Sequence, residues 1–553
     1  MAEGIESAIK FLKELRMVLE PSFGPYGKDI LLKSNTGKTY VTKSGLSVLR
    51  QLEIKHPMGA LIKNNIDCFS RCTGDLCKTF ALVLTHLIES IHSKFINDVS
   101  STKARDMQSL LSCLSMSFTK IASFLSLDVI YFALNKHLKS LNLDPGELHG
   151  NYFDGVLEAS LASKHNMQTK NIIKGIIKDV FKILSFTFEN LEYLIYNFEM
   201  VCVNVHGLPL NYSRVITGAI IERECVPSCI DWQNCCFIVL CGDLSRASGD
   251  DIFLNLTKDC SIQAQLDATV TSYQNLINVL KHKKINIIFA EQSLPKQLGF
   301  LLQSNQIAYV EHVLKDDLLH LCSLYETSFL SGLYDIFFLE ENVIGQISFF
   351  KSCTLGKQVC CHLGPAVLTN KKRPNLKILL CSHSDGIGRE YSQTINNLFK
   401  MLSQCFNSDH ATCSVMPACG VFETFLANYC SEVLVRDPTF DKTLQHILTE
   451  SLFTIPKLLF ENLSKHKAKR FLPYLPCRIN SASTTELNLV GINVKTGDFV
   501  DASAIEVYEP FSTKVLLVKN VLQLCSQIIR IDRIVPIIKP ICKVNENCEI
   551  EDV

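Results

Sequence analysis

The chain has 553 residues, more than one compact core usually sustains, so we expect several domains that need no disulfide or metal for stability. Lysine and arginine number 55, and aspartate and glutamate also number 55. This balance excludes a net basic field that would attract nucleic acid and an acidic field that would mimic it. Protein partners or small ligands are favoured instead.

The 24 cysteines are scattered through apolar segments and include adjacent pairs such as Cys360 and Cys361. The chain has no CxxC pair, and the spacing of Cys68 and Cys72 is not that of a zinc site. Packed, reduced thiols are therefore expected. The N-terminal sequence MAEGIESAIKFLKELR has no basic region before an apolar stretch, so it does not resemble a secretory signal. A cytosolic or nuclear location is expected.

The segment from Ile121 to Leu134 is the most apolar part of the N-terminal region, and Asp128 interrupts it. It falls short of the roughly 20 apolar residues that a membrane-spanning helix needs. We therefore expect a buried helix here and no membrane span.

The N-terminal region is predicted to be mainly helical. Apolar residues at spacings of three and four between Ile5 and Leu19 indicate a helix that ends at Pro21. The next expected elements are hairpin strands over 29–32 and 39–42, a helix after Gly45, and a helix over 79–91.

After about Phe198 the pattern changes to short β-branched runs that alternate with amphipathic segments. We predict strands over 201–205, 236–241, 285–290, 307–311 and 376–381, and helices over 294–302, 315–325, 389–406 and 518–529. This order predicts an α+β multidomain chain in which an α/β domain is inserted within a helical one.

Two glycine-containing segments are candidate phosphate-binding loops: GPYGK at 24–28 and TGDLCKT at 73–79. Phosphates bind where backbone N–H groups converge at the start of a helix, and glycine permits the close approach. Each segment alone is more often an ordinary turn or helix cap. The order in which the two loops occur, together with the motifs that follow them, is stronger evidence for a phosphate site than either loop alone.

Taken together, the motifs resemble those of the group II chaperonins, the family of the cytosolic ring chaperonin and the archaeal thermosome. The segments that carry the resemblance, with the family's pattern after each, are 24–27 (GPxG), 42–49 (TNDGATIL), 56–57 (HP), 74–79 (GDGTTS), 392–398 (RSLHDAL), 417–423 (PGGGAxE) and 491–501 (GVDVxTGxxxD), followed by Glu509-Pro510 and Arg530-Ile531-Asp532. The resemblance runs nearly from end to end.

The resemblance implies a group II chaperonin fold with three domains. The expected parts are a mainly helical equatorial domain over 1–130 and 396–540, a small intermediate domain over 131–207 and 365–395, an inserted α/β apical domain over 208–364, and a disordered acidic tail over 541–553. The family's helical lid protrusion would fall within 252–280, where only the second half has a helical pattern.

The resemblance also assigns a nucleotide site. Its candidate residues are Gly24, Pro25, Gly27, Gly45, Gly74, Asp75, Lys78, Thr79, Gly420 and Asn493, with Asp75 as the magnesium ligand if nucleotide binds. The family's two acids that position the attacking water correspond to Ser44 and Asn396, neither of which can act as a base. We therefore expect no catalytic residue and no hydrolysis. The sequence leaves binding of ATP and magnesium open.

Such losses are typical of the divergent chaperonin-like members linked to Bardet–Biedl syndrome. That resemblance implies a non-catalytic protein that assembles the ciliary BBSome with related chaperonin-like proteins and the cytosolic ring chaperonin. It further implies a role in cilium biogenesis and a place in the cytoplasm, at the centrosome or basal body. One alternative is a working ATPase in which Lys78 and Asp385 or Glu390 replace the lost groups. A second is a scaffold that binds neither nucleotide nor client.

Overall fold

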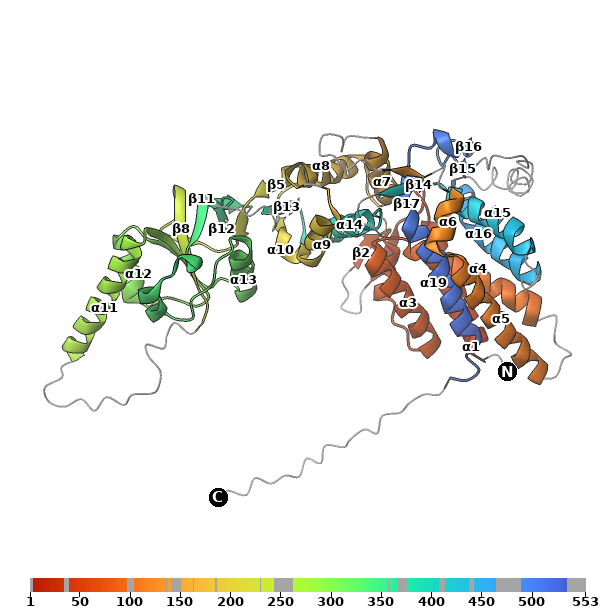
Figure 1. The fold of residues 1–553 in the computed structure, drawn as a ribbon, viewed down its shortest axis with the longest axis horizontal. Coiled ribbons are helices and arrows are strands. Elements are labelled where there is room, and N and C mark those ends of the chain that lie inside the picture. The colour runs from red at the N-terminus through yellow and green to blue at the C-terminus, as the bar shows by residue number, and fades with distance from the viewer. Residues whose placement is uncertain are drawn as a thin grey trace, which may run out of the picture. The chain divides into compact units, whose positions relative to one another are not determined.

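The structure of the chain, a computed structural model, describes residues 3–33, 39–96, 104–134, 138–140, 151–162, 164–184, 186–228, 230–242, 262–356, 358–366, 375–406, 413–436, 442–463 and 489–534 (Figure 1). The chain divides into two compact units. Unit 1 comprises residues 1–138, 162–164 and 416–553, and unit 2 comprises residues 139–161 and 165–415.

Unit 1 is mainly helical. Its elements are α1 (Glu3–Leu19), η1 (Glu20–Ser22), β1 (Ile30–Lys33), β2 (Thr39–Thr42), α2 (Gly45–Gln51), α3 (Pro57–Thr73), α4 (Cys77–Ile91), η2 (His92–Ile96), α5 (Ala104–Phe124), α6 (Leu127–Leu134), α15 (Val421–Arg436), α16 (Lys442–Leu463), β15 (Val490–Ile492), β16 (Phe499–Asp501), η7 (Ala502–Ala504), β17 (Tyr508–Pro510) and α19 (Phe511–Ile529). The predicted first helix, the β1–β2 hairpin and the helix after Gly45 are confirmed.

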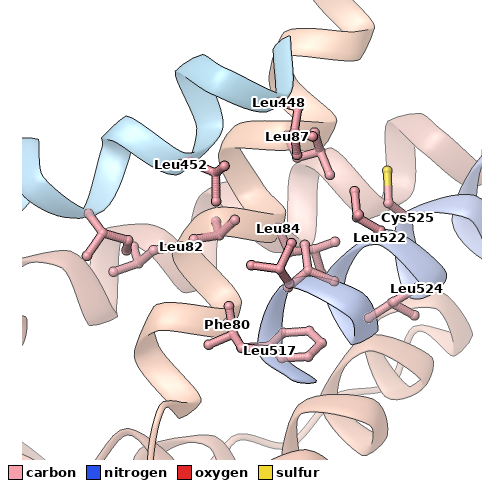
Figure 2. Packing of buried hydrophobic residues seen from close by; sticks show 14 of the residues in the cluster. Phe80, Leu82, Leu84, Leu87, Leu448, Leu452, Leu517, Leu522, Leu524 and Cys525 are labelled. Atoms are coloured by element: carbon pink, nitrogen blue, oxygen red, sulfur yellow. The ribbon is translucent and has the colours of Figure 1, made fainter. Parts of the chain in front are cut away.

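The core of unit 1 is built around α4. A helix that is apolar on nearly all sides must be surrounded by protein. Helix α4 meets this condition, because it packs against α1, α16 and α19. Figure 2 shows Leu82 and Leu84 of α4 among side chains from α16 and α19, including Leu452 and Leu522. The loop that precedes α4 is therefore attached to a helix in the core of the unit.

The apolar segment from Ile121 to Leu134 departs from the single buried helix that we predicted. Helix α5 ends at Phe124 and α6 begins at Leu127. Ser126 starts the new helix, because its hydroxyl oxygen accepts a hydrogen bond from the backbone N–H of Val129 at 3.4 Å. Within the part of the chain that the structure describes, no helix combines the length and apolar character that a membrane crossing requires.

Unit 2 contains the α/β part of the chain. Its elements are β3 (Lys139–Ser140), α7 (Asn151–Leu161), α8 (Met167–Ile183), α9 (Phe188–Tyr196), α10 (Phe198–Val201), β4 (Cys202–His206), η3 (Leu210–Tyr212), β5 (Arg214–Thr217), β6 (Ala219–Ile221), β7 (Cys225–Val226), β8 (Asp231–Leu240), α11 (Ile262–His282), β9 (Ile285–Ala290), α12 (Lys296–Ser304), β10 (Ala308–Val310), α13 (Lys315–Leu324), η4 (Leu333–Phe338), η5 (Glu341–Val343), β11 (Gly345–Leu355), β12 (Gln358–Leu363), β13 (Leu376–Ser382) and α14 (Asp385–Ser403). Strand β14 (Ser414–Pro417) leads from unit 2 into unit 1.

The main sheet of unit 2 has seven strands in the order β6-β12-β11-β8-β9-β10-β7. Strands β8, β9 and β10 run parallel, and α11 and α12 connect them, as the predicted β-α-β order requires. Apolar residues cover both faces of these strands, with Phe237 and Phe289 in one cluster and Ile238 and Ile288 in another. The prediction of an α/β unit is confirmed. A second sheet has the order β4-β13-β5.

The two units only partly parallel the three domains that we predicted. The predicted apical segment lies wholly within unit 2. Helix α14 runs without a break through the expected boundary between 395 and 396, and the chain returns to unit 1 only at Met416. The three-domain division stays a prediction. Residues 252–261 of the lid segment and the tail over 541–553 lie outside the described residues, while α11 covers the rest of the lid segment.

The cysteines whose positions the structure describes are free, and most are buried, which agrees with the predicted packed thiols. Cys68 and Cys72 are exposed on α3. Burial raises the pKa of the Cys77 thiol to about 12, so this side chain at the start of α4 is an apolar packing group at neutral pH.

Candidate functional site

The first candidate loop is a tight turn that follows η1. Gly24 has a φ of 78°, and its carbonyl oxygen accepts a hydrogen bond from the N–H of Gly27 at 3.1 Å; Pro25 lies between them. A Cβ atom at Gly27 would lie 2.3 Å from the Ser22 carbonyl oxygen, so only glycine fits there. Asn462 of α16 fixes the turn by donating to the Phe23 carbonyl oxygen at 2.9 Å. The backbone of this loop is therefore well supported.

Ser44, at one of the two positions of the expected acids, is the N-cap of α2. Its hydroxyl oxygen accepts a hydrogen bond from the backbone N–H of Ser47 at 3.3 Å. Its own N–H donates to the hydroxyl oxygen of Thr42 at 3.0 Å. These contacts give Ser44 a structural task at the start of the helix, and its hydroxyl has no carboxylate basicity with which to activate water.

The second candidate loop connects α3 to α4. Gly74 caps α3 with a φ of 79°, and its N–H donates to the Ser70 carbonyl oxygen at 2.9 Å. Leu76, where the family has glycine, keeps a left-handed backbone with a φ of 68°. A left-handed conformation costs a side-chain-bearing residue about 1–2 kcal/mol. The loop backbone thus has a conformation at Leu76 that glycine adopts readily and leucine disfavours.

Asp75, the expected magnesium ligand, is already engaged by protein groups. Its Oδ1 accepts a hydrogen bond from the N–H of Leu76 at 2.8 Å, and its Oδ2 lies 3.1 Å from the ammonium of Lys164. Lys164 belongs to the short segment 162–164 of unit 1, which lies between α7 and α8 in the sequence. We did not predict Lys164, because nothing in the sequence around it points to an aspartate 89 residues away.

Lys78 occupies the space between the two loops. Its ammonium donates a hydrogen bond to the Ser22 carbonyl oxygen at 2.5 Å. A Cβ atom added to Gly45 would lie 2.6 Å from Cγ of Lys78, so the lysine stem packs directly on the start of α2. Burial is the largest cause of a pKa of about 8 for Lys78; the charges of Lys164 and Lys43 act in the same direction, and that of Asp75 opposes them.

The remaining candidates of the C-terminal half lie in supporting turns. Gly420 has a φ of 83°, and Cys419 has a φ of 63° in place of a family glycine. The Cys419 carbonyl oxygen accepts a hydrogen bond from Ile492 at 3.1 Å, which ties this turn to β15. Asn493 uses its side-chain oxygen to accept the N–H of Lys495 at 2.9 Å. Asn493 thus stabilises its own turn. Thr79, in the first turn of α4, is 6% exposed.

A buried ion cluster lies beside these turns. The ammonium of Lys514 lies 2.9 Å from Glu423 and 2.7 Å from Glu509, and the side chains of Lys514 and Glu423 are at most 5% exposed. Burial raises the pKa of Glu509, and the nearby charges of Glu423 and Asp75 act in the same direction. The cluster therefore lies in the electrostatic neighbourhood of the Asp75 loop. Glu423 and Glu509 belong to the motifs identified in the sequence, whereas Lys514 was not predicted.

Asn396, at the position of the second expected acid, lies on α14 in unit 2. Its side-chain oxygen is buried and has no hydrogen-bond partner among the described residues. Asp385 precedes it by eleven residues, roughly 16 Å along the helix axis at 1.5 Å per residue, and pairs with Arg389. Glu390 precedes it by six residues, on another face of the helix. Neither acid can take the place of Asn396.

The described residues contain no group of three or more histidine, cysteine, aspartate or glutamate side chains that could hold a metal. A magnesium ion at this loop would therefore depend on Asp75 and on the phosphate oxygens of a nucleotide. Asp75 is the one candidate ligand that we predicted, and both of its oxygens already have partners. The structure brings Gly45, Asp75 and Lys78 together in unit 1 and places Asn396 in unit 2. A nucleotide-binding role for these residues stays a prediction.

Comparison with known proteins identifies relatives along most of the chain. The BBSome complex assembly protein BBS10 of Pongo abelii is 21% identical over 426 residues. The match covers 73% of this chain and 58% of that protein, so the chain spans less than two thirds of the length of this relative. The T-complex protein 1 subunit alpha of Encephalitozoon cuniculi is 20% identical over 539 residues, which cover 96% of this chain and 94% of that protein.

A solved structure of similar fold is the group III chaperonin in the open state, with a TM-score of 0.68 at 14% identity. The similarity covers 96% of this chain and 98% of that one, and it confirms the predicted chaperonin fold. The sequence model of the TCP-1/cpn60 chaperonin family matches residues 15–539. The chain therefore belongs to the TCP-1/cpn60 chaperonin family.

Proposed function

We propose that this protein is a chaperonin-like factor that assists assembly of the BBSome without hydrolysing ATP. The observation that carries the loss of hydrolysis is the chemistry at Ser44 and Asn396. The first is a helix cap and the second a neutral amide, so neither can accept a proton from an attacking water molecule. In phosphoryl transfer the protein acts chiefly by positioning the reacting groups and by supplying charge. The loss of both acids removes the groups that position the attacking water.

The names of the relatives support the assembly role, since BBSome complex assembly proteins are among them. We propose that the chain acts with other chaperonin-like Bardet–Biedl proteins and with subunits of the cytosolic ring chaperonin, and that BBSome subunits are its clients. Its place of action would be the cytoplasm, at the centrosome or basal body, where it would support cilium biogenesis. A protein that works by holding its clients needs binding surface rather than turnover.

Affinity purification of the tagged full chain from ciliated cells tests the assembly role. We expect chaperonin-like subunits and BBSome components to be enriched over a tagged unrelated protein. A Ser44→Ala variant with a normal melting transition should recover the same partners, because holding does not require hydrolysis. Absence of both groups of partners from the full chain would contradict the proposal.

A further inference from the structure

The space between the two candidate phosphate loops contains a side chain of the protein itself. Lys78 starts in the first turn of α4, its stem packs on Gly45, and its ammonium reaches the carbonyl oxygen of Ser22. These contacts come from three separate segments of unit 1. The lysine is therefore held in one position by both ends of its side chain.

The position of this lysine matters for phosphate binding because of what it covers. Phosphate groups bind at the start of a helix when the first N–H groups and adjacent glycine backbone can approach them closely. Helix α4 begins at Cys77, and its N-cap, Leu76, provides no side-chain cap. The Lys78 stem lies between that helix start and Gly45, the glycine that would have to approach a ligand.

The ammonium of Lys78 is unsuited to act as a phosphate ligand in this position. Its hydrogen bond to Ser22 uses one of its three N–H donors and fixes where the ammonium lies, so a phosphate elsewhere along the cradle could draw it away only at the expense of that bond. The Ser22 carbonyl oxygen would then face the ligand, and a buried acceptor without a partner is unfavourable. The two partners of Asp75 are the N–H of Leu76 and the ammonium of Lys164, and both compete with a metal for its carboxylate oxygens.

We infer that Lys78 closes the phosphate cradle, so that this chain keeps the local structure of a nucleotide site without binding ATP. The lysine supplies the positive charge and the packing at the place where a nucleotide and its metal would otherwise bind. This inference goes beyond the proposed function, which concerns hydrolysis and assembly and would stand if ATP bound without turnover.

Two variants of the full chain that differ only at residue 78 test this inference. Leu76→Gly with Cys77→Thr restores the family's loop but keeps Lys78, and the triple variant adds Lys78→Thr. Binding of a fluorescent ATP analogue in magnesium is measured by titration, and the melting temperature with and without magnesium-ATP is measured in parallel. We expect binding in the triple variant to be at least tenfold tighter than in the double variant and the wild type, which should show no thermal shift.

Equal binding by the double and triple variants, or a thermal shift of the wild type that Asp75→Ala abolishes, would overturn the inference. Absence of binding by a folded triple variant would overturn it as well. If the triple variant does not fold, Lys78→Ala and Lys78→Met replace the pair: the shorter side chain should open the cradle to the ATP analogue and the longer one should not. Equal binding of the ATP analogue by these two variants would contradict the inference that Lys78 closes the cradle. Phosphate release and partner recovery are separate readouts, so a failure here leaves the proposed function intact.

Discussion

Unit 1 contains a buried lysine, Lys514, and a partly buried one, Lys78, and their surroundings shift their pKa values in opposite directions. Lys514 lies between Glu423 and Glu509, and their charges raise its pKa despite the opposing effect of burial. Lys78 has a carbonyl oxygen as its closest polar partner, and burial lowers its pKa to about 8. The first lysine is part of the framework that holds α15, β17 and α19 together. The second lies at the predicted nucleotide site, and its charge is poorly compensated.

The difference shows how a ligand site can decay while its scaffold persists. The ion cluster depends on both signs of charge, and loss of Lys514 would leave both glutamates without their cation. The loop around Lys78 has accepted new side chains, because its path is set by the helices that flank it. The predictions that follow test this contrast, from the largest expected effect to the smallest.

Lys514→Met should be the most destabilising of these changes. It leaves the buried Glu423 and the partly buried Glu509 without a cation, and removing one partner of a buried pair typically costs about 3–5 kcal/mol. Urea unfolding of the full chain, followed by circular dichroism, measures the change. Lys94→Met, which removes one side of the half-exposed pair with Glu450, is the matched control and should cost less than about 1 kcal/mol.

Lys78→Met should remove a pH dependence of stability that the wild type has. The folded-state pKa is about 8, below the usual lysine value of about 10.4, so the unfolded chain binds more protons between these values. The penalty of the buried charge is fully present below pH 8 and is relieved as the pH rises toward 10.4. Wild-type stability relative to the variant should therefore increase by about 1–2 kcal/mol between pH 7 and pH 10.

Unfolding midpoints of the two proteins at matched pH values provide this comparison, since the other titrating groups are common to both. A constant difference across that range would show that Lys78 is not a poorly compensated charge. The contrast with Lys514 would then disappear.

At position 76 the alanine and glycine variants should have the reverse of their usual order of stability. At an ordinary exposed helix position such as Met116, glycine is about 1 kcal/mol less stable than alanine. At Leu76 the left-handed backbone should make Leu76→Gly more stable than Leu76→Ala by about 1 kcal/mol. Both pairs of variants can be compared by thermal unfolding. The same order at the two positions would mean that the loop backbone does not keep its left-handed conformation at Leu76.

Ser44 provides the smallest expected effect. Ser44→Ala removes the cap of α2 and should cost about 1 kcal/mol, whereas Ser44→Asp keeps a capping oxygen and should change stability by less than about 0.5 kcal/mol. Thermal unfolding again measures both. Equal losses in the two variants would contradict the capping role.

Much of the fold could be predicted from local patterns. The spacing of apolar residues identified α1, the β1–β2 hairpin and the parallel strands of unit 2, because these patterns reflect which face of each element is buried. The break between α5 and α6 was missed, since a single serine cap within an apolar run leaves the apolar pattern unchanged. The predicted domain boundary between 395 and 396 falls inside α14, and local patterns did not show that the helix runs through it.

The candidate site was less predictable, because its contacts join distant segments. The motif order identified Asp75, Lys78 and Ser44 as positions of interest. It could not show that Lys164 pairs with Asp75, or that Lys78 reaches the carbonyl of Ser22, which lies 56 residues earlier. Backbone acceptors carry no sequence signal, so such partners emerge only from the three-dimensional packing.

The loss of hydrolysis is the central claim, and phosphate release by the purified full chain in magnesium-ATP tests it most directly. The account predicts no release above a protein-free blank for the wild type and for its Asp75→Ala variant alike. Release by the wild type that the Asp75→Ala variant lacks would contradict it.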